Sequence, residues 1–254
     1  MSESKQKIAL ITGATGGIGF EVAKRLGKDG FTVILNGIEE DKGTERLKTL
    51  KEEGITAEYY GFDVTNEDQV NENIKKIGEK YGKIDAVVNN AGGLGGRSRF
   101  EEMTTEFFRS VMALNLDSTF FVSRAAIPYL KKSDYASIVN YTSNAGWNAG
   151  GPGAGIYGTS KAAVHTLTRA LAKDLAEYGI RVNAVSPGTI DTPFHAQIKS
   201  TKPEVFASWK NNIMLGRLGK PEDVAGVVAF LVGKDAAFIT AETVQVGGGQ
   251  ALGI

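Results

Sequence analysis

Short apolar runs alternate with longer stretches of helical periodicity along the whole chain, and this alternation limits the fold more than any other feature. The strand-like runs are Lys7–Thr12, Phe31–Asn36, Ala57–Phe62, Ile84–Asn89, Ala136–Thr142, Ile180–Ser186 and Thr243–Val246. Helical spacing of apolar residues lies between them, over Gly17–Asp29, Asp41–Glu53, Glu67–Tyr81, Thr104–Lys132, Ile156–Tyr178 and Pro221–Val232. Strands joined by helices of this length form βαβ units, whose parallel sheet is covered by helices on both faces. The continuously apolar strands agree with this, because such strands are buried on both sides.

We therefore predict one α/β domain over residues 1–254, with a doubly wound, seven-stranded and mainly parallel sheet. No linker or low-complexity stretch interrupts the pattern. The segment Thr189–Arg217 is less regular and contains Phe194, Phe206 and Trp209. We expect it to form a lobe over the sheet edge that acts as a substrate lid.

Composition excludes several classes of function. The chain has 29 acidic and 29 basic residues, and a net charge of zero argues against a nucleic acid or an anionic membrane as the main partner. It has no cysteine and only two histidines, His165 and His195, which argues against a thiolate or zinc site, so no metal is expected. The polar start and the lack of a long apolar stretch predict neither a signal peptide nor a membrane span, and we expect a cytoplasmic protein.

A glycine-rich turn follows the first strand and opens the first helix. It reads Thr12-Gly-Ala-Thr-Gly-Gly-Ile-Gly19. Glycines at 13, 17 and 19 permit a tight turn and close approach of the backbone to a pyrophosphate, while the helix N-terminus offers free N–H groups. A turn without a ligand is the alternative, but the position in a βαβ unit favours a Rossmann-type dinucleotide site.

The end of the second strand selects the adenosine ribose in such sites, because a carboxylate binds the 2′-hydroxyl and a basic group favours a 2′-phosphate. This chain reads Asn36-Gly-Ile-Glu-Glu-Asp41, with Gly37 or Ile38 where an acidic residue is expected. No basic residue lies in 36–41, and three acidic side chains would repel a phosphate. We therefore favour NAD(H) over NADP(H), although these acids could also simply stabilise the start of the second helix.

Acid–base catalysis is indicated by Tyr157 and Lys161, which are four residues apart on one helix and so share a face. Reduction of a ketone leaves a developing alkoxide that needs a proton donor. A free tyrosine has a pKa of about 10, and a neighbouring ammonium is expected to lower it. Ser143 follows the fifth strand, at the edge where open α/β sheets bind ligands, and could donate to the substrate carbonyl. Thr142 is a rival donor.

Together these motifs resemble those of the short-chain dehydrogenase/reductase family, in its compact branch of about 250 residues. The matching motifs are the turn at Thr12–Gly19, Asp63-Val64, Asn89-Asn-Ala-Gly92, Asn115, Ser143, Tyr157-x-x-x-Lys161 and Pro187-Gly-Thr-Ile-Asp-Thr192. The likeness covers nearly the whole chain, and this order of motifs is very specific. It implies an NAD(P)(H)-dependent oxidoreductase that interconverts a carbonyl and a secondary alcohol.

The resemblance also implies roles for individual residues. Asn115, Ser143, Tyr157 and Lys161 would be catalytic, with Lys161 also holding the nicotinamide ribose and Asn115 kinking its helix and positioning a water. Asp63 and Val64 would hold the adenine, Asn90 and Gly92 would line the adenosine side, and Ile190 and Thr192 would fix the carboxamide. The full expected cofactor set is Gly13, Thr15, Gly17, Ile18, Gly19, Ile38, Asp63, Val64, Asn90, Ala91, Gly92, Tyr157, Lys161, Pro187, Gly188, Ile190 and Thr192.

The chain departs from the family pattern in three places. The ribose-selecting aspartate is missing, the usual Asp-Gly-Gly after the last strand reads Gly247-Gly-Gly249, and the gap between Ser143 and Tyr157 is one residue longer than the family's because of Gly150-Gly-Pro-Gly153. None of these departures removes a catalytic group.

The loop after the fourth strand indicates the substrate. It contains Arg97 and Arg99, either of which could clamp a carboxylate, although both could instead be solvated. Trp147 and Asn148 are expected to shape the pocket, and Phe194 to close over it with His195 and Trp209. We predict a small anionic keto acid or keto-sugar acid, because the Asn-Gly-Ile sequence and the arginine loop resemble uronate and keto-sugar-acid reductases.

Alternatives stay open at this stage. Within the family they are a 3-oxoacyl thioester, hydroxybutyrate, steroid or simple sugar dehydrogenase. The epimerase branch uses the same tyrosine–lysine pair but needs a larger carboxyl-terminal domain. A redox sensor that binds NAD(P)H without chemistry would have no need of the four catalytic residues together. The resemblance further implies a homotetramer that pairs the helices near 104–132 and 156–178.

Overall fold

The computed structural model describes residues 6–250. Within this range seven strands form one sheet in the order β3-β2-β1-β4-β5-β6-β7, and every neighbouring pair is parallel. The strands are β1 (Lys7–Ile11), β2 (Phe31–Gly37), β3 (Ala57–Gly61), β4 (Ala86–Asn89), β5 (Ser137–Tyr141), β6 (Arg181–Pro187) and β7 (Thr243–Val246). The predicted doubly wound sheet is confirmed.

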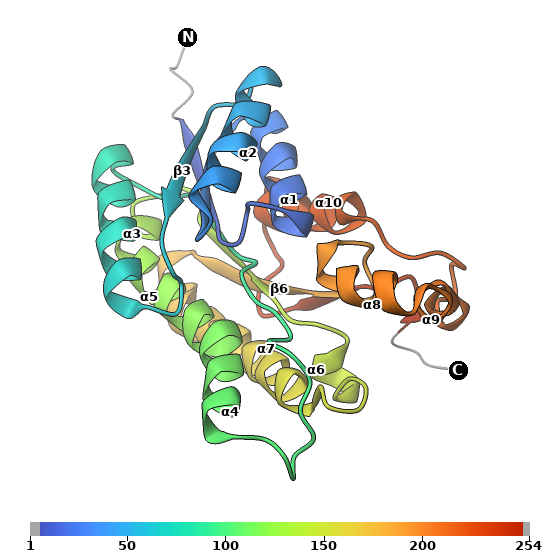
Figure 1. Cartoon of the computed structure of the whole chain (residues 1–254). Coiled ribbons are helices and arrows are strands. Elements are labelled where there is room, and N and C mark those ends of the chain that lie inside the picture. Colours follow the sequence, from blue (N-terminus) through green and yellow to red (C-terminus); the bar gives the residue numbers. More distant parts are fainter. Residues whose placement is uncertain (1–5, 251–254) are drawn as a thin grey trace.

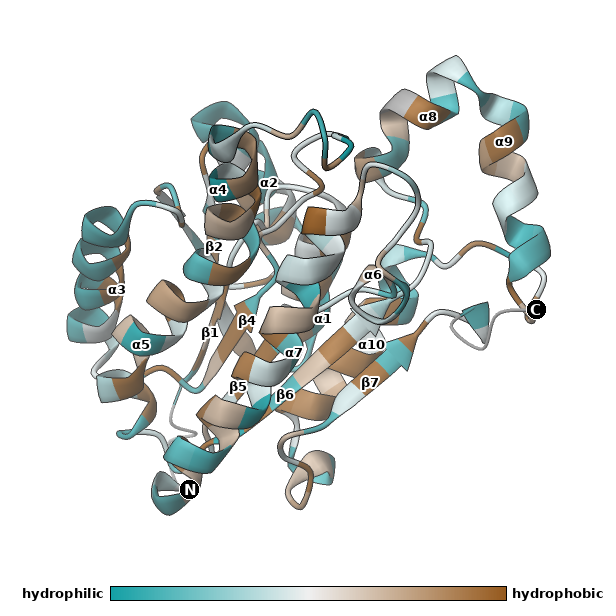
Figure 2. Ribbon diagram, turned by 90° about the horizontal axis from the view of Figure 1, so that it is seen from below, coloured by the Kyte–Doolittle hydropathy of each residue, from teal (hydrophilic) through white to brown (hydrophobic). Residues whose placement is uncertain are grey.

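Helices cover both faces of this sheet (Figure 1). They are α1 (Gly17–Lys28), α2 (Glu40–Glu52), α3 (Glu67–Tyr81), α4 (Thr105–Met112), α5 (Ser118–Leu130), α6 (Ala145–Asn148), α7 (Gly155–Leu175), α8 (Ala196–Thr201), α9 (Pro203–Ser208) and α10 (Pro221–Val232). One core cluster joins the strands to α1, α2 and α10, and a second joins them to α3, α5 and α7. The hydrophobic colour along the central strands in Figure 2 reflects burial between these two layers.

The direction in which successive strands are added to the sheet reverses between β1 and β4, which lie side by side at its centre. After β1 the chain winds outward through β2 and β3, and after β4 it winds the opposite way through β5, β6 and β7. Such a switch in strand order opens a crevice at the carboxyl ends of the strands. A cavity lies at this edge of the sheet.

The predicted helix over Thr104–Lys132 is interrupted at its middle. It consists of α4, a π-helical turn over Ala113–Asp117, and α5. The extra residue of a π-turn widens the helix locally and is common at functional sites. Asn115 lies in this turn, so the kink that the family resemblance implies takes the form of a π-turn.

The segment Thr189–Arg217 contains more helix than the sequence indicates. Two short helices, α8 and α9, stand out from the sheet layers as an arch (Figures 1 and 2). Pro203 starts α9 at its first position, which proline favours because its missing N–H is not needed there. Each helix is too short to show a clear period in the sequence.

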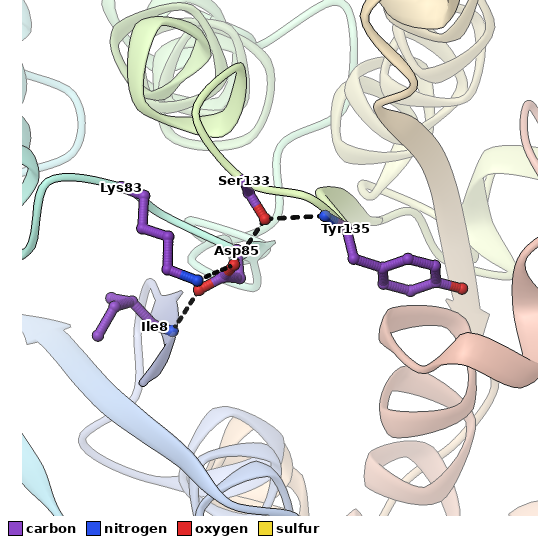
Figure 3. A network of polar contacts seen from close by, with 5 residues as sticks. All are labelled: Ile8, Lys83, Asp85, Ser133 and Tyr135. Atoms are coloured by element: carbon purple, nitrogen blue, oxygen red, sulfur yellow. Dashed lines mark hydrogen bonds and ion pairs between the residues drawn. The ribbon is translucent and has the colours of Figure 1, made fainter. Parts of the chain in front are cut away.

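A buried aspartate fastens the amino-terminal edge of the sheet, opposite the cavity. Asp85 accepts hydrogen bonds from the Ile8 backbone N–H at 2.8 Å, the Lys83 ammonium at 2.8 Å and the Ser133 hydroxyl at 2.5 Å (Figure 3). These bonds join the starts of β1 and β4 to the turn before β5. Because the carboxylate is both paired and hydrogen-bonded, its burial is compensated.

Candidate active site

A cavity of about 1010 Å³ opens at the carboxyl ends of the central strands. The loops after β1, β4, β5 and β6 line it, together with the first turn of α7 and part of the arch formed by α8 and α9. Because every strand of the sheet is parallel, side chains from segments far apart in sequence meet at this one edge.

The glycine turn forms one end of the cavity. Gly13 has φ +60°, and a Cβ there would lie 3.0 Å from the Cα of Ala91. A Cβ on Gly19 would lie 2.5 Å from Asn90 Nδ2, which donates to the carbonyls of Thr12 and Gly13. The turn and the Asn90 loop are therefore in contact that a larger residue would break.

The N-terminus of α1 opens toward this end of the cavity without a capping side chain. Gly16 occupies the N-cap position in an extended conformation and makes no side-chain hydrogen bond. Thr15, Gly16, Gly17 and Ile18 all line the cavity. Unpaired N–H groups at the positive end of a helix dipole form an anion site, and this fits a dinucleotide pyrophosphate.

Three residues expected at the adenosine end do not belong to the cavity lining. Ile38 is 75% exposed after β2 and does not line the cavity. Asp63 follows β3, where its carboxylate accepts from the backbone N–H and the hydroxyl of Thr65, both at 2.8 Å, and Val64 beside it is buried. Neither Asp63 nor Val64 lines the cavity, so their expected role toward adenine remains a prediction.

Sequence reasoning missed two basic residues at this end, Lys42 and Arg46 of α2, which both line the cavity. The Lys42 ammonium pairs with Glu39 at 2.8 Å. Arg46 Nε donates to the carbonyl of Thr15 at 3.2 Å, and its guanidinium lies 4.8 Å from the Phe20 ring centroid. A search confined to residues 36–41 could not find them, although their four-residue spacing on one helix face was a usable signal.

The expected catalytic residues Ser143, Tyr157 and Lys161 come together at the centre of the cavity. Tyr157 lies in the first turn of α7 and Lys161 one turn later. Lys161 is buried, with Nζ donating to the carbonyl of Tyr141 at 2.9 Å and lying 5.9 Å from the Tyr157 ring centroid. The Ser143 hydroxyl is hydrogen-bonded to the Tyr157 phenol.

The rivalry between Ser143 and Thr142 is decided by their hydrogen bonds. The hydroxyl of Thr142 is buried and donates to the carbonyl of Val185 in β6 at 3.0 Å. Only Ser143 therefore has its hydroxyl directed to Tyr157.

The prediction that a neighbouring side chain of the protein lowers the pKa of Tyr157 is wrong. Burial raises the pKa of Tyr157, and the hydrogen bond from Ser143 opposes this rise. The Lys161 ammonium is held toward the Tyr141 carbonyl, and burial lowers its own pKa to about 8. Desolvation disfavours both charged forms, and it outweighs the attraction on which the sequence argument relied.

Asn115 is hydrogen-bonded to the loop that carries Gly92. Its side chain is buried, accepts from Gly93 N–H at 3.0 Å, and donates to the carbonyls of Gly93 and Val111 at 2.9 Å each. A Cβ on Gly92 would lie 2.8 Å from Asn115 Oδ1 and 2.9 Å from Lys161 Nζ. Asn115 and Lys161 thus flank Gly92, and the site has no room there for a larger residue.

The loop after β6 completes the cavity wall. Four of its expected cofactor residues, Pro187, Gly188, Ile190 and Thr192, line the cavity. A Cβ on Gly17 would lie only 3.8 Å from Thr192, so this loop reaches back to the glycine turn. Gln250, which no motif indicated, also lines the cavity and bonds to this loop.

The candidate substrate residues divide into two groups. Arg97, Asn148 and Phe194 line the cavity, and the Phe194 ring lies 6.4 Å from that of Tyr157. Arg97 also donates to the carbonyl of Pro152 at 2.9 Å, which ties its loop to the glycine-rich segment before α7.

Trp147 and Arg99 do not line the cavity, contrary to the sequence expectation. The indole N–H of Trp147 donates to the Ser186 hydroxyl at 3.2 Å, and its ring packs against His165 of α7 at 4.8 Å. The hydrogen bond to β6 turns this side chain away from the pocket. Arg99 is exposed on its loop.

The part of the chain from residue 6 to residue 250 offers neither a metal cluster nor a membrane-spanning helix. Over this range, no cluster of three or more histidine or acidic side chains is placed to hold a metal ion. Among the described helices, none is long and apolar enough to cross a membrane.

Comparison with known proteins agrees with the geometry. The family model described as "Enoyl-(Acyl carrier protein) reductase" matches residues 13–251. A diacetyl reductase ((S)-acetoin forming) of Staphylococcus aureus is 37% identical over 97% of this chain and 98% of its own. The 3-oxoacyl-[acyl-carrier-protein] reductase FabG of Thermotoga maritima is 38% identical over 96% of this chain and 97% of its own.

The solved structure of a short-chain type dehydrogenase/reductase from Mycobacterium ulcerans superposes with a TM-score of 0.92, at 30% identity, over 99% of this chain and 92% of that one. Fold and site thus define an NAD(P)-dependent oxidoreductase with a Rossmann-type sheet. The chain belongs to the short-chain dehydrogenase/reductase family.

Proposed function

We propose that this enzyme interconverts a carbonyl and a secondary alcohol, with Tyr157 as the acid and base. The observation that carries the proposal is the contact of the Tyr157 phenol with the Ser143 hydroxyl, with the buried Lys161 one helical turn away. These three groups lie in one cavity with an uncapped helix N-terminus, so a dinucleotide bound at that end could extend to them.

The residues present fit a nicotinamide dinucleotide. The glycines at 13, 17 and 19 and the free N–H groups of α1 would hold its pyrophosphate, and the loop from Pro187 to Thr192 would hold its carboxamide. When bound, the nicotinamide supplies or accepts the hydride.

The protein's own groups handle the proton. In reduction the Tyr157 hydroxyl would donate its proton to the developing alkoxide, while the Ser143 hydroxyl holds the same oxygen. The raised pKa of Tyr157 keeps this phenol protonated and ready to donate. For oxidation the phenolate is required, and positive charge from Lys161 and from an oxidised nicotinamide would favour it.

Lys161 can also relay a proton, because a pKa of about 8 lets it both lose and regain one near neutral pH. Asn115 would fix the loop beside it and position a water between Lys161 and solvent. Each of these roles rests on the side-chain positions together with the family resemblance.

NAD(H) is the proposed cofactor. Glu39 lies at the adenosine end of the cavity and its charge opposes a 2′-phosphate. The two cations nearby are already engaged, Lys42 by Glu39 and Arg46 by the Thr15 carbonyl and the Phe20 ring. The dissociation constants of NADH and NADPH test this choice, and tighter binding of NADPH would reverse it.

A small anionic keto acid or keto-sugar acid is the proposed substrate. Arg97 brings a guanidinium to the cavity wall, where it could bind a carboxylate through two hydrogen bonds. The named relatives act on other carbonyl compounds, diacetyl and a 3-oxoacyl-[acyl-carrier-protein], so they leave this choice open.

Arg97→Ala compared with Arg99→Ala tests the substrate class, because both arginines are on one loop but only Arg97 lines the cavity. Over a panel of carbonyl compounds, Arg97→Ala should raise KM for anionic substrates by about tenfold or more and leave neutral ones unchanged. Equal losses on neutral and anionic substrates would contradict carboxylate binding.

Tyr157→Phe tests the reaction itself. We expect kcat to fall by roughly 10²- to 10⁴-fold while the affinity for NADH is retained, because only the hydroxyl is removed. Tyr178→Phe, the same change just beyond the far end of α7, is the control. If the variant kept full turnover, or if its biological activity persisted without turnover, the acid–base role would be wrong and a cofactor sensor would be favoured.

We further propose that the chain forms a homotetramer through its exposed helices. Phe108 of α4 and Phe120 of α5 are 44% and 38% exposed, and both lie on the helical run that the family resemblance pairs between subunits. Burial of such side chains is a common driving force for association. Light scattering of the purified protein measures the assembly directly.

A further inference from the structure

One side chain near the carboxyl end of the described chain joins three loops of the active site. The Oε1 atom of Gln250 accepts from the Thr189 backbone N–H at 2.8 Å and from Asn144 Nδ2 at 3.2 Å. Its Nε2 donates to the Thr189 hydroxyl at 2.9 Å. Asn144 follows β5, Thr189 follows β6 and Gln250 follows β7, so one amide links the ends of three neighbouring strands.

The backbones around this amide are packed too closely for side chains. A Cβ on Gly188 would lie 2.6 Å from Gln250 Oε1 and 2.7 Å from the Cα of Gly247. A Cβ on Gly247 would lie 3.3 Å from Asn144 Nδ2. This tight contact favours glycine at position 247, where the family pattern has aspartate.

The orientation of the Gln250 amide is determined by its partners. A backbone N–H can only donate, so the atom facing Thr189 N must be the oxygen. With that oxygen also facing Asn144, the latter must present its amide nitrogen. The cluster is therefore held in one arrangement.

The two loops that Gln250 joins carry different parts of the proposed site. Asn144 is the immediate neighbour of Ser143, which is hydrogen-bonded to Tyr157. Thr189 lies between Gly188 and Ile190 in the loop that would hold the nicotinamide carboxamide. A change in the spacing of these loops would move the nicotinamide relative to the hydroxyls of Ser143 and Tyr157.

We propose that Gln250 is a positioning residue that fixes the nicotinamide-binding loop against the Ser143 loop. This inference rests on the proposed function for the identity of the cofactor. It predicts that loss of the Gln250 amide weakens binding of the nicotinamide half of the cofactor and leaves binding of the adenosine and pyrophosphate half unchanged.

Binding of two ligands separates these halves. ADP-ribose carries the adenosine, the pyrophosphate and a ribose but no nicotinamide, whereas NADH carries both halves. Their dissociation constants would be measured by calorimetry on Gln250→Leu, Gln250→Glu and the wild type. Gln245→Leu is the matched control, because Gln245 is an exposed residue of β7 five positions away.

We expect Gln250→Leu to weaken NADH binding about three- to tenfold, which corresponds to one or two hydrogen bonds, with ADP-ribose binding unchanged. Gln250→Glu should restore most of the NADH affinity, because its carboxylate can accept from both donors and from the Thr189 hydroxyl. With an accepted substrate, kcat of Gln250→Leu should fall about tenfold to a hundredfold, more than KM changes.

Several outcomes would overturn the proposal. They are equal losses for NADH and ADP-ribose, no loss for either ligand, or an equally large loss in Gln250→Glu. A circular dichroism melt would show whether each variant is folded before binding is measured. Failure of the proposed function looks different: the wild type would then turn over no carbonyl compound, while Gln250→Leu would still lose affinity for NADH alone.

Discussion

Lys161 carries its ammonium group in a buried setting that costs stability and fits the proton relay proposed for it. It is buried, its Nζ donates to the carbonyl of Tyr141, and burial lowers its pKa from 10.5 to about 8. In the unfolded chain this pKa returns to an ordinary value. Below pH 8 both states are charged, so the folded state bears the full cost of burying the ammonium. Above about pH 10.5 both states are neutral and the cost is gone.

Lys161→Met should therefore gain stability relative to the wild type at neutral pH and lose activity. The stability difference between the two proteins should shrink by about 3 kcal/mol as the pH rises from 7 through 8 to 10.5. Urea unfolding of both proteins across this pH range measures it, since groups common to both cancel in the difference. A difference that stays constant with pH would show that Lys161 is not buried as an ammonium.

Gly92 is a second residue whose surroundings restrict which side chain can replace it. A Cβ there would meet Asn115 Oδ1 at 2.8 Å and Lys161 Nζ at 2.9 Å, whereas a Cβ on Gly93 would meet only the Leu114 side chain at 3.5 Å. We expect Gly92→Ala to lower kcat about tenfold to a hundredfold by displacing Lys161. Gly93→Ala should leave kcat nearly unchanged, because both backbone bonds of Gly93 to Asn115 are retained. Steady-state kinetics of the two variants tests this prediction. Equal kcat values for Gly92→Ala and Gly93→Ala would argue against crowding at Gly92.

Motifs identified the candidate catalytic residues but not their electrostatics. The order of Ser143, Tyr157 and Lys161 along the chain predicted that they meet, because it places Ser143 directly after β5 and the other two on α7 at one edge of the sheet. The direction of the Tyr157 pKa depends on burial and on where the Lys161 ammonium points. Likewise, the reach of Arg46 to Thr15 depends on how α2 packs beside α1. These properties belong to tertiary structure, which spacing along the chain does not contain.

Elements of regular structure were the most predictable level, because short continuous apolar runs alternate along the chain with longer stretches of helical period. All seven strand-like runs match observed strands to within a few residues. The π-turn at Ala113–Asp117 was not predicted in this form, since one extra residue in a turn does not disturb the apolar pattern around it. The short helices α6, α8 and α9 offer at most six residues each, too few for a period to be measured.

Arg181 shows how one side chain can complete an element. It is buried at the start of β6, and its guanidinium donates to the carbonyls of Leu231, Val232 and Gly233 at the end of α10 and to that of Ala236 in the turn after it. Its guanidinium carbon also lies 5.1 Å from the Tyr135 ring centroid. The last carbonyls of a helix have no partner within the helix, so this cation satisfies them and faces the negative end of the dipole.

Arg181→Met should lower the free energy of unfolding by about 2–4 kcal/mol, because it removes the charge-assisted hydrogen bonds of a buried guanidinium to four carbonyls. Lys234→Met, an exposed change just after α10, should cost less than about 0.5 kcal/mol. Urea unfolding measures both. Turnover per folded molecule should be preserved, since Arg181 lies at the sheet edge opposite the cavity. A small loss of stability in Arg181→Met would mean that water replaces the guanidinium without penalty.

At the scale of the whole molecule, one sheet edge carries the site and one projecting arch covers part of it. The arch contains a continuous set of ring contacts: Phe194 with His195 at 4.9 Å, His195 with Trp209 at 5.2 Å, and Trp209 with Phe206 at 5.3 Å. Phe194 also lies 6.4 Å from the ring of Tyr157. A movement of α8 and α9 would therefore change the surroundings of Trp209 and of Tyr157 together.

Tryptophan fluorescence tests the predicted lid directly, because the chain has only two tryptophans, Trp147 and Trp209. In Trp147→Phe, Trp209 is the single reporter, and it lines the cavity. Adding NAD⁺ with an alcohol substrate should shift its emission to shorter wavelength and roughly halve its quenching by acrylamide, because a closed lid excludes water. In the complementary Trp209→Phe protein, Trp147 packs on His165 and should report no change. Equal responses from both reporters, or none from Trp209, would mean that the segment Thr189–Arg217 is a fixed wall.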